Sequence, residues 1–180
     1  MTALRTVVGG IWVVFWIYWG VSALRSKRGT GTARGVPMRL LVAVAVILLF
    51  RLVHAGSLDV HSVVSAALGT ALVIAGLGFA VWARIHIGRN WGMPMSQKEE
   101  PELVTSGPYR FVRHPIYTGI LVAVVGTALA IDLLALAVAA IVGVFFWYSA
   151  TAEERNLGAI FPRAYPAYRA RTKMLIPFVF

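Results

Sequence analysis

Cysteine is absent from this 180-residue sequence, which excludes disulfide bonds, thiolate metal sites and cysteine nucleophiles. Histidine is scarce as well, and the four histidines are too scattered to suggest a metal cluster. Charged residues make up 13% of the chain, whereas an average soluble protein has about 25%. Together with a hydrophobic fraction of 59%, this scarcity of charge indicates a protein that lies mostly within a membrane.

Acidic residues are also few, seven against 17 basic residues, so the formal net charge is +10. In a soluble protein this excess would suggest nucleic acid as a partner. In a membrane protein, basic residues set the orientation of the chain and contact anionic lipid head groups. Because the sequence contains no soluble module with interleaved basic and aromatic residues, we expect the lipid bilayer as a partner and no nucleic acid.

Five apolar segments predict an all-α, polytopic membrane protein, approximately at residues 6–24, 38–53, 62–85, 116–131 and 133–150. A membrane-crossing helix needs about 17–25 residues, so the first and third segments are long enough and the others are marginal. Asp132 separates the last two segments and predicts a tight helical hairpin. A basic cluster follows the first segment, so we expect that segment to remain in the protein rather than to act as a cleaved signal peptide.

Basic residues fall into three groups of five, between the first two segments, between the third and fourth, and in the C-terminal tail. Their members are Arg25, Lys27, Arg28, Arg34 and Arg39; Arg84, Arg89, Lys98, Arg110 and Arg113; and Arg155, Arg163, Arg169, Arg171 and Lys173. Five spans would place all three groups on one membrane face. The positive-inside rule makes that face cytosolic, with the N-terminus outside and the C-terminus inside.

Small residues recur at helix-packing intervals in the third and fourth segments and predict a close approach of the two helices. They are Gly69, Gly76, Gly78, Gly119, Gly126 and Ala130. Between these segments, residues 86–115 contain repeated glycine and proline residues. Proline lacks a backbone N–H and restricts the preceding residue, so this stretch predicts a structured loop with backbone groups available to a ligand. An ordinary connecting loop is the alternative.

Two blocks of sequence carry a recognisable pattern. The first reads LVTSGPY at 103–109 and RHPIYTG at 113–119, and the second runs from EE at 153–154 through FPRAYPAYR to LIP at 175–177. Together they resemble the isoprenylcysteine carboxyl methyltransferase family and its phospholipid methyltransferase relatives. The resemblance implies a membrane-embedded S-adenosylmethionine-dependent methyltransferase. Its cofactor site would face the cytosol, and its lipid-like acceptor would enter from the bilayer.

The resemblance also implies roles by position. The cofactor residues would be Gln97, Leu103, Val104, Tyr109, His114, Pro115, Ile116, Tyr117 and Glu153. Arg113 and Glu153 would be catalytic by positioning rather than by proton transfer. Methyl transfer is an in-line displacement on carbon that mainly requires the nucleophile and the sulfonium to be aligned and kept dry.

One position departs from the family pattern. Prenylcysteine enzymes carry an arginine four residues before the cofactor-binding glutamate, where it suits the carboxylate of the acceptor, but this chain has Ser149. Arg113 or Arg155 would have to replace that arginine, or the acceptor is not a prenylcysteine carboxylate. Ser149 and Arg155 are therefore the candidate substrate residues, and the acceptor is a lipid-like carboxylate or amine.

Two other functions remain open from the sequence. A nicotinamide-dependent reductase of the sterol-reductase type has a similar RHPxY motif, but it would be expected to have more spans and further polar motifs. A non-enzymatic membrane scaffold would not need RHPxYxG and Glu153 together. We expect one membrane domain, with two spans in residues 1–60 and the methyltransferase core in 61–180. The tail mixes basic and aromatic residues, which predicts a segment at the membrane interface.

Overall fold

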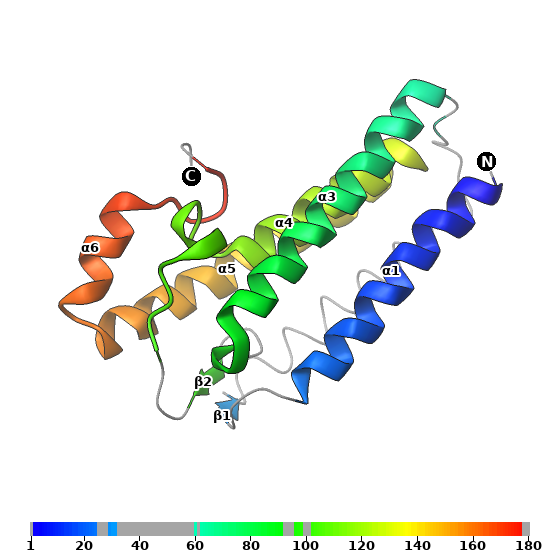
Figure 1. Cartoon of the computed structure of the whole chain (residues 1–180). Helices are drawn as coiled ribbons and strands as arrows, with labels where there is room; N and C mark the ends of the chain where they lie inside the picture. Colours follow the sequence, from blue (N-terminus) through cyan, green and yellow to red (C-terminus); the bar gives the residue numbers. More distant parts are fainter. Residues whose placement is uncertain are drawn as a thin grey trace.

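The computed structural model describes residues 2–24, 29–31, 60, 62–91, 96–98 and 102–177. Within these residues the chain is mostly helical (Figure 1). Among the described residues, three helices are long and apolar enough to cross a membrane: α1 (Thr2–Ala23), α3 (Val63–Ile87) and α5 (Ala135–Ile160). The other α-helices among the described residues are α4 (Pro115–Ala130) and α6 (Ala164–Arg171). The predicted all-helical fold is therefore confirmed, and it includes three candidate membrane spans among the described residues.

The number of spans stays a prediction. The predicted second segment, residues 38–53, lies outside the described residues. Helix α4 matches the predicted fourth segment, but its 16 residues extend about 24 Å, less than the roughly 30 Å of a bilayer core. Two strands of three residues, β1 (Gly29–Gly31) and β2 (Ser96–Lys98), pair antiparallel. Short 3-10 helices, η1 (Gly88–Asn90) and η2 (Gly107–Arg110), lie in the loop before α4.

Helices α3 and α4 pack closely and antiparallel through glycines (Figure 1). A Cβ atom added at Gly76 would lie 2.5 Å from the carbonyl oxygen of Gly119, and Gly69 meets Gly126 in the same way. Such small residues let two backbones approach in a membrane, where the hydrophobic effect does not drive helices together. The predicted close approach is therefore confirmed. Gly78 is an exception, because a Cβ atom there would meet nothing within 4 Å.

The predicted hairpin between α4 and α5 is also confirmed. Asp132 is buried in the turn, and its Oδ1 accepts a hydrogen bond of 2.8 Å from the backbone N–H of Leu134. This local bond is typical of aspartate in turns and aligns the start of α5. The hairpin brings the C-terminal half of α5 back beside the first turn of α4.

Helix α5 continues ten residues beyond Ala150, where the predicted apolar segment ends, and stops at Ile160. The added residues are mostly good helix formers, so a loss of hydrophobicity does not end the helix. The 26 residues extend about 39 Å, more than a bilayer core. Glu153 and Glu154 consequently lie inside a helix, about two turns before its end, and not at a solvated terminus.

Beyond α6 the chain returns across the start of α4 in an extended segment, residues 172–175, which we call the return segment. The backbone N–H groups of Arg113 and His114 donate to the carbonyls of Lys173 and Met174 at 2.8 and 3.1 Å. The hydroxyl of Thr118 donates to the carbonyl of Leu175 at 2.6 Å. These bonds attach the C-terminal tail to the RHPxYxG motif.

Candidate functional site

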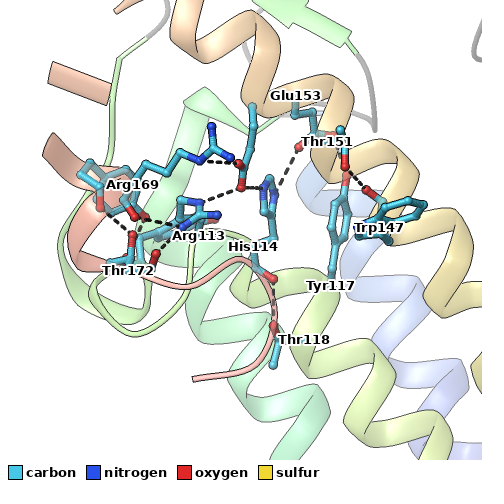
Figure 2. A network of polar contacts seen from close by, with 12 residues as sticks. Arg113, His114, Tyr117, Thr118, Trp147, Thr151, Glu153, Arg169 and Thr172 are labelled. Atoms are coloured by element: carbon cyan, nitrogen blue, oxygen red, sulfur yellow. Dashed lines mark hydrogen bonds and ion pairs between the residues drawn. The ribbon is translucent and has the colours of Figure 1, made fainter. Parts of the chain in front are cut away.

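A cluster of polar side chains lies where α5, the start of α4 and the return segment meet (Figure 2). Pro115 is the first residue of α4, a position where its missing N–H costs nothing. It also keeps His114 out of helical geometry, with φ −123° and ψ 61°. The chain therefore turns at His114, and Arg113 and His114 meet Glu153 and Glu154 of α5. We call Arg113, His114, Tyr117, Glu153 and Glu154 the polar cluster.

Glu154 is the buried centre of this cluster, with a side chain only 6% exposed. Its Oε1 accepts a hydrogen bond of 2.6 Å from Nε of Arg113 and lies 3.3 Å from Nε2 of His114. Its Oε2 lies 3.7 Å from Nε of Arg169. A buried carboxylate pays a large desolvation cost, which close and well-oriented cationic partners offset. Glu154 therefore contributes to the structure of the site.

Arg113 joins three parts of the chain. Besides Glu154, its Nη1 donates to the backbone carbonyls of Arg169, at 3.3 Å, and Thr172. Its side chain is only 8% exposed. The guanidinium therefore ties α5 to the end of α6 and to the return segment. Its action on an acceptor stays a prediction.

The imidazole of His114 lies between the two carboxylates. Its Nδ1 is 3.6 Å from Oε2 of Glu153 and its Nε2 is 3.3 Å from Oε1 of Glu154. Burial by itself lowers the pKa of His114, but hydrogen bonds and charge from Glu153 and Glu154 outweigh burial and raise the pKa above its ordinary value. The two carboxylates therefore stabilise the protonated form of His114 relative to its neutral form.

Glu153 is the more accessible carboxylate, with 26% of its side chain exposed. Its Oε1 accepts a hydrogen bond of 2.6 Å from the hydroxyl of Tyr117. The ring of Tyr117 stacks on His114, with centroids 5.5 Å apart and planes at 5°, and on Phe146, at 4.3 Å and 9°. Three nearly parallel rings thus lie next to a carboxylate. This combination suits an organic cation with flat groups.

The other predicted cofactor residues form an apolar layer beside the polar cluster. Tyr109, Ile116 and Tyr117 are buried together with Phe146, and Val104 packs against them. Pro115 is buried and Leu103 is partly buried. Burial raises the pKa of Tyr109, so its phenol stays neutral at physiological pH. Its backbone carbonyl accepts a hydrogen bond of 2.7 Å from Tyr168 of α6.

The remaining candidates lie elsewhere. Ser149 is fully buried one turn before Glu153 on the same face of α5, and its Oγ has no hydrogen-bond partner among the described residues. Arg155 is exposed and follows Glu153 by two residues, so it points to a different side of the helix. Gln97 lies in β2 opposite Thr30 of β1, and its side chain is outside the described part of the structure.

The sequence did not indicate that Glu154 is the buried centre of the polar cluster. It also did not indicate that Phe146, Arg169 and His86 contact residues of the site. Glu154 and Phe146 share the inward face of α5, which helical spacing alone could have indicated. The ring of His86 lies 2.9 Å from Oγ of Ser106 and covers Gly107, which has a positive φ of 58°. No local sequence signal indicates that contact.

Comparisons with known proteins point to one family. The profile of a family described as phospholipid methyltransferase matches residues 64–164, which contain α3 except its first residue, all of α4 and α5, and the polar cluster. Protein-S-isoprenylcysteine O-methyltransferases B and A of Arabidopsis thaliana are 34% and 33% identical to this chain, each over 62% of this chain and 58% of the relative. A probable protein-S-isoprenylcysteine O-methyltransferase of Oryza sativa subsp. indica is 32% identical, over 61% of this chain and 53% of the relative. The chain thus spans about half the length of the curated relatives it matches.

Proposed function

This chain belongs to the phospholipid methyltransferase family, and from that premise we propose that it transfers a methyl group from S-adenosylmethionine to an amphiphilic acceptor in the membrane. The observation that carries the proposal is the polar cluster, in which a partly exposed carboxylate lies next to a stack of flat rings. The cluster is formed by the RHPxYxG motif and the paired glutamates of α5. The family match covers both, which favours a methyltransferase over the reductase and the scaffold.

The residues present fit this cofactor chemically. S-adenosylmethionine has cationic ammonium and sulfonium groups, a carboxylate and a flat adenine. Glu153 would accept hydrogen bonds from the cofactor, and Tyr117 and His114 would orient Glu153 through their contacts with its two carboxylate oxygens. When bound, the cofactor supplies an electrophilic methyl group on its sulfonium. The backbones of Leu103 and Val104 would contact the adenine.

Titration calorimetry on protein purified in detergent tests the cofactor. S-adenosylhomocysteine should bind with micromolar affinity, and Glu153→Gln should weaken binding about 10- to 150-fold through the loss of a charge-assisted bond of roughly 1.5–3 kcal/mol. Glu154→Gln should weaken it much less. No heat and no thermal shift at millimolar ligand would refute the cofactor assignment. Equal losses of affinity in the two variants would refute the role of Glu153.

For the acceptor we propose an amine-headed amphiphile. Arg113 is already bonded to Glu154 and to two backbone carbonyls, and neutral Ser149 stands where a carboxylate-binding arginine is expected. A buried carboxylate without a cationic partner binds poorly. A protonated amine must first lose a proton to free its lone pair for attack, and water or a nearby base takes that proton. The names of the plant relatives support a prenylcysteine carboxylate as the second candidate.

Methylation assays with both acceptors separate the two candidates. Wild-type protein should methylate a farnesylated cysteine analogue weakly and an amine-headed phospholipid better. Ser149→Arg should raise activity toward the cysteine analogue, because it restores a cation, whereas Ser149→Ala should not. Robust turnover of the cysteine analogue by the wild-type protein would refute the amine proposal and leave the methyltransferase proposal intact.

We also propose that the N-terminus lies outside and that the polar cluster and the C-terminus lie in the cytosol. The three groups of basic residues support this orientation. Because the chain has no cysteine, single cysteines introduced at Thr2 and Gly31 can be labelled individually with a membrane-impermeant reagent. They should react from opposite sides of the membrane, and labelling from the same side would refute the topology.

A further inference from the structure

The segment from Arg163 to Lys173 has an inner face that is fixed to the rest of the protein. Tyr165, Tyr168 and Thr172 are 3%, 4% and 7% exposed, and their spacing places them on one side of α6. The hydroxyl of Tyr168 donates to the backbone of Tyr109 at 2.7 Å. These contacts set the rotation of α6 about its axis and therefore decide which residues face outward.

The outer face of this segment is basic. Arg163, Arg171 and Lys173 are exposed, and Arg169 is 65% exposed although it reaches Glu154. Exposed small residues lie among them, namely Ala164, Pro166, Ala167 and Ala170. Residues 155–177 include five basic and no acidic residues. Because the side chains between these basic residues are small, the cations can approach a flat, negatively charged surface closely.

The position of α6 relative to α5 favours a lipid surface. Helix α5 is a candidate membrane span that ends at Ile160, and α6 begins at Ala164. The three intervening residues extend at most about 11 Å, so α6 cannot move far from the end of that span. Figure 1 shows α6 at this end of α5, beyond the long helices.

A second observation places the same end of the protein at a membrane interface. The guanidinium of Arg110 lies over the ring of Phe111 at 4.6 Å. Phe111 in turn lies 6.5 Å from Trp82, an exposed tryptophan near the C-terminal end of α3. Exposed tryptophan beside aromatic and basic side chains is typical of the head-group region of a bilayer.

We propose that the outer face of residues 163–173 is a docking surface for anionic lipid head groups. Each basic residue near an anionic membrane surface is attracted by about 1 kcal/mol, which corresponds to about fivefold in affinity. The return segment follows α6 directly, so docking presses the tail toward the membrane while its inner face holds the polar cluster. The surface charge of the membrane therefore acts on the segment that is bonded to Arg113, His114 and Thr118.

The proposal is tested with a fluorescent label on a single cysteine introduced at Ala167, in lipid nanodiscs that contain a head-group quencher. Discs of phosphatidylcholine are compared with discs that also contain phosphatidylglycerol. Quenching should rise in the anionic discs and fall again in about 1 M salt, where the Debye length is about 3 Å. Combining Arg163→Gln, Arg171→Gln and Lys173→Gln should remove the response, with about fivefold loss for each cation.

A label at Val64, an exposed residue at the opposite end of α3, is the matched control and should not respond to lipid charge. Unchanged tryptophan fluorescence would verify that the triple variant is folded. Equal quenching at Ala167 in the two kinds of disc, or an undiminished response in the triple variant, would overturn the proposal and make the basic face a solvated one. The assay uses neither cofactor nor acceptor, so it is independent of the methyltransferase proposal.

Discussion

Replacing each of the two adjacent glutamates by glutamine should separate the stability of the site from its binding function. Glu154 is 6% exposed and bonded to Arg113 at 2.6 Å, whereas Glu153 is 26% exposed and accepts its 2.6 Å bond from a neutral tyrosine. Breaking a buried ion pair costs about 3–5 kcal/mol. Because the amide oxygen of glutamine still accepts one hydrogen bond, we expect Glu154→Gln to cost about 3 kcal/mol, the lower end of that range.

Glu153→Gln keeps an acceptor for Tyr117 and removes a partly solvated charge that lies 3.6 Å from His114, so its expected cost is about 0–1 kcal/mol. A chain of this size shifts its unfolding midpoint by about 2–4 °C per kcal/mol. Glu154→Gln should therefore lower the midpoint by roughly 6–12 °C and Glu153→Gln by no more than roughly 4 °C. Thermal unfolding in detergent, followed by the fluorescence of the six tryptophans, measures both.

A double-mutant cycle identifies the partner. The double variant with Arg113→Gln and Glu154→Gln should lose less free energy of unfolding than the two single variants lose in sum. The difference, the coupling energy, should be about 0.5–3 kcal/mol. Additive effects, or equal midpoint shifts for Glu153→Gln and Glu154→Gln, would refute the conclusion that the Arg113–Glu154 contact supports the site.

Two further predictions concern the helix contact and the histidine. Gly76→Ala should destabilise the protein by about 1–3 kcal/mol, because the added methyl group would overpack against α4. Gly78 faces open space, so Gly78→Ala should be neutral or stabilising by up to about 1 kcal/mol. Similar unfolding midpoints for the two variants would contradict the contact between α3 and α4. The pKa of His114 is raised in the folded state, so its contribution is complete below its unfolded pKa of about 6.5 and is lost as the pH rises through the folded value. The midpoint should therefore fall toward alkaline pH, and His114→Gln should flatten that slope; an unchanged slope would show that another group titrates.

The sequence predicted the parts of the fold that depend on local pattern. The apolar runs identified α1, α3 and α4 within a few residues, since continuous hydrophobicity and flanking polar residues are visible without a structure. The glycine pairs between α3 and α4 followed from spacing, except at Gly78, because spacing alone does not tell which of two nearby glycines faces the partner. The apolar run did not indicate the end of α5, because the helix outlasts its hydrophobic part.

For the candidate site as well, the sequence indicated some features and only the structure revealed others. The motifs identified His114, Tyr117 and Glu153, and the hairpin turn at Asp132 already implied that they meet at one end. Which of the two adjacent glutamates is buried depends on the rotation of α5 about its axis relative to α4. The sequence alone does not indicate that rotation.

The sequence by itself determined a helical membrane chain, the small residues at which its helices meet, and the residue types of the site, because each follows from local hydrophobicity, spacing and motif. Only the tertiary structure decided that Arg113 pairs with Glu154 and with carbonyls at 169 and 172, and that Ser149 is buried. These three partners lie 41 to 59 residues from Arg113 along the chain. Their encounter depends on how α4, α5 and α6 pack together, which no single segment specifies.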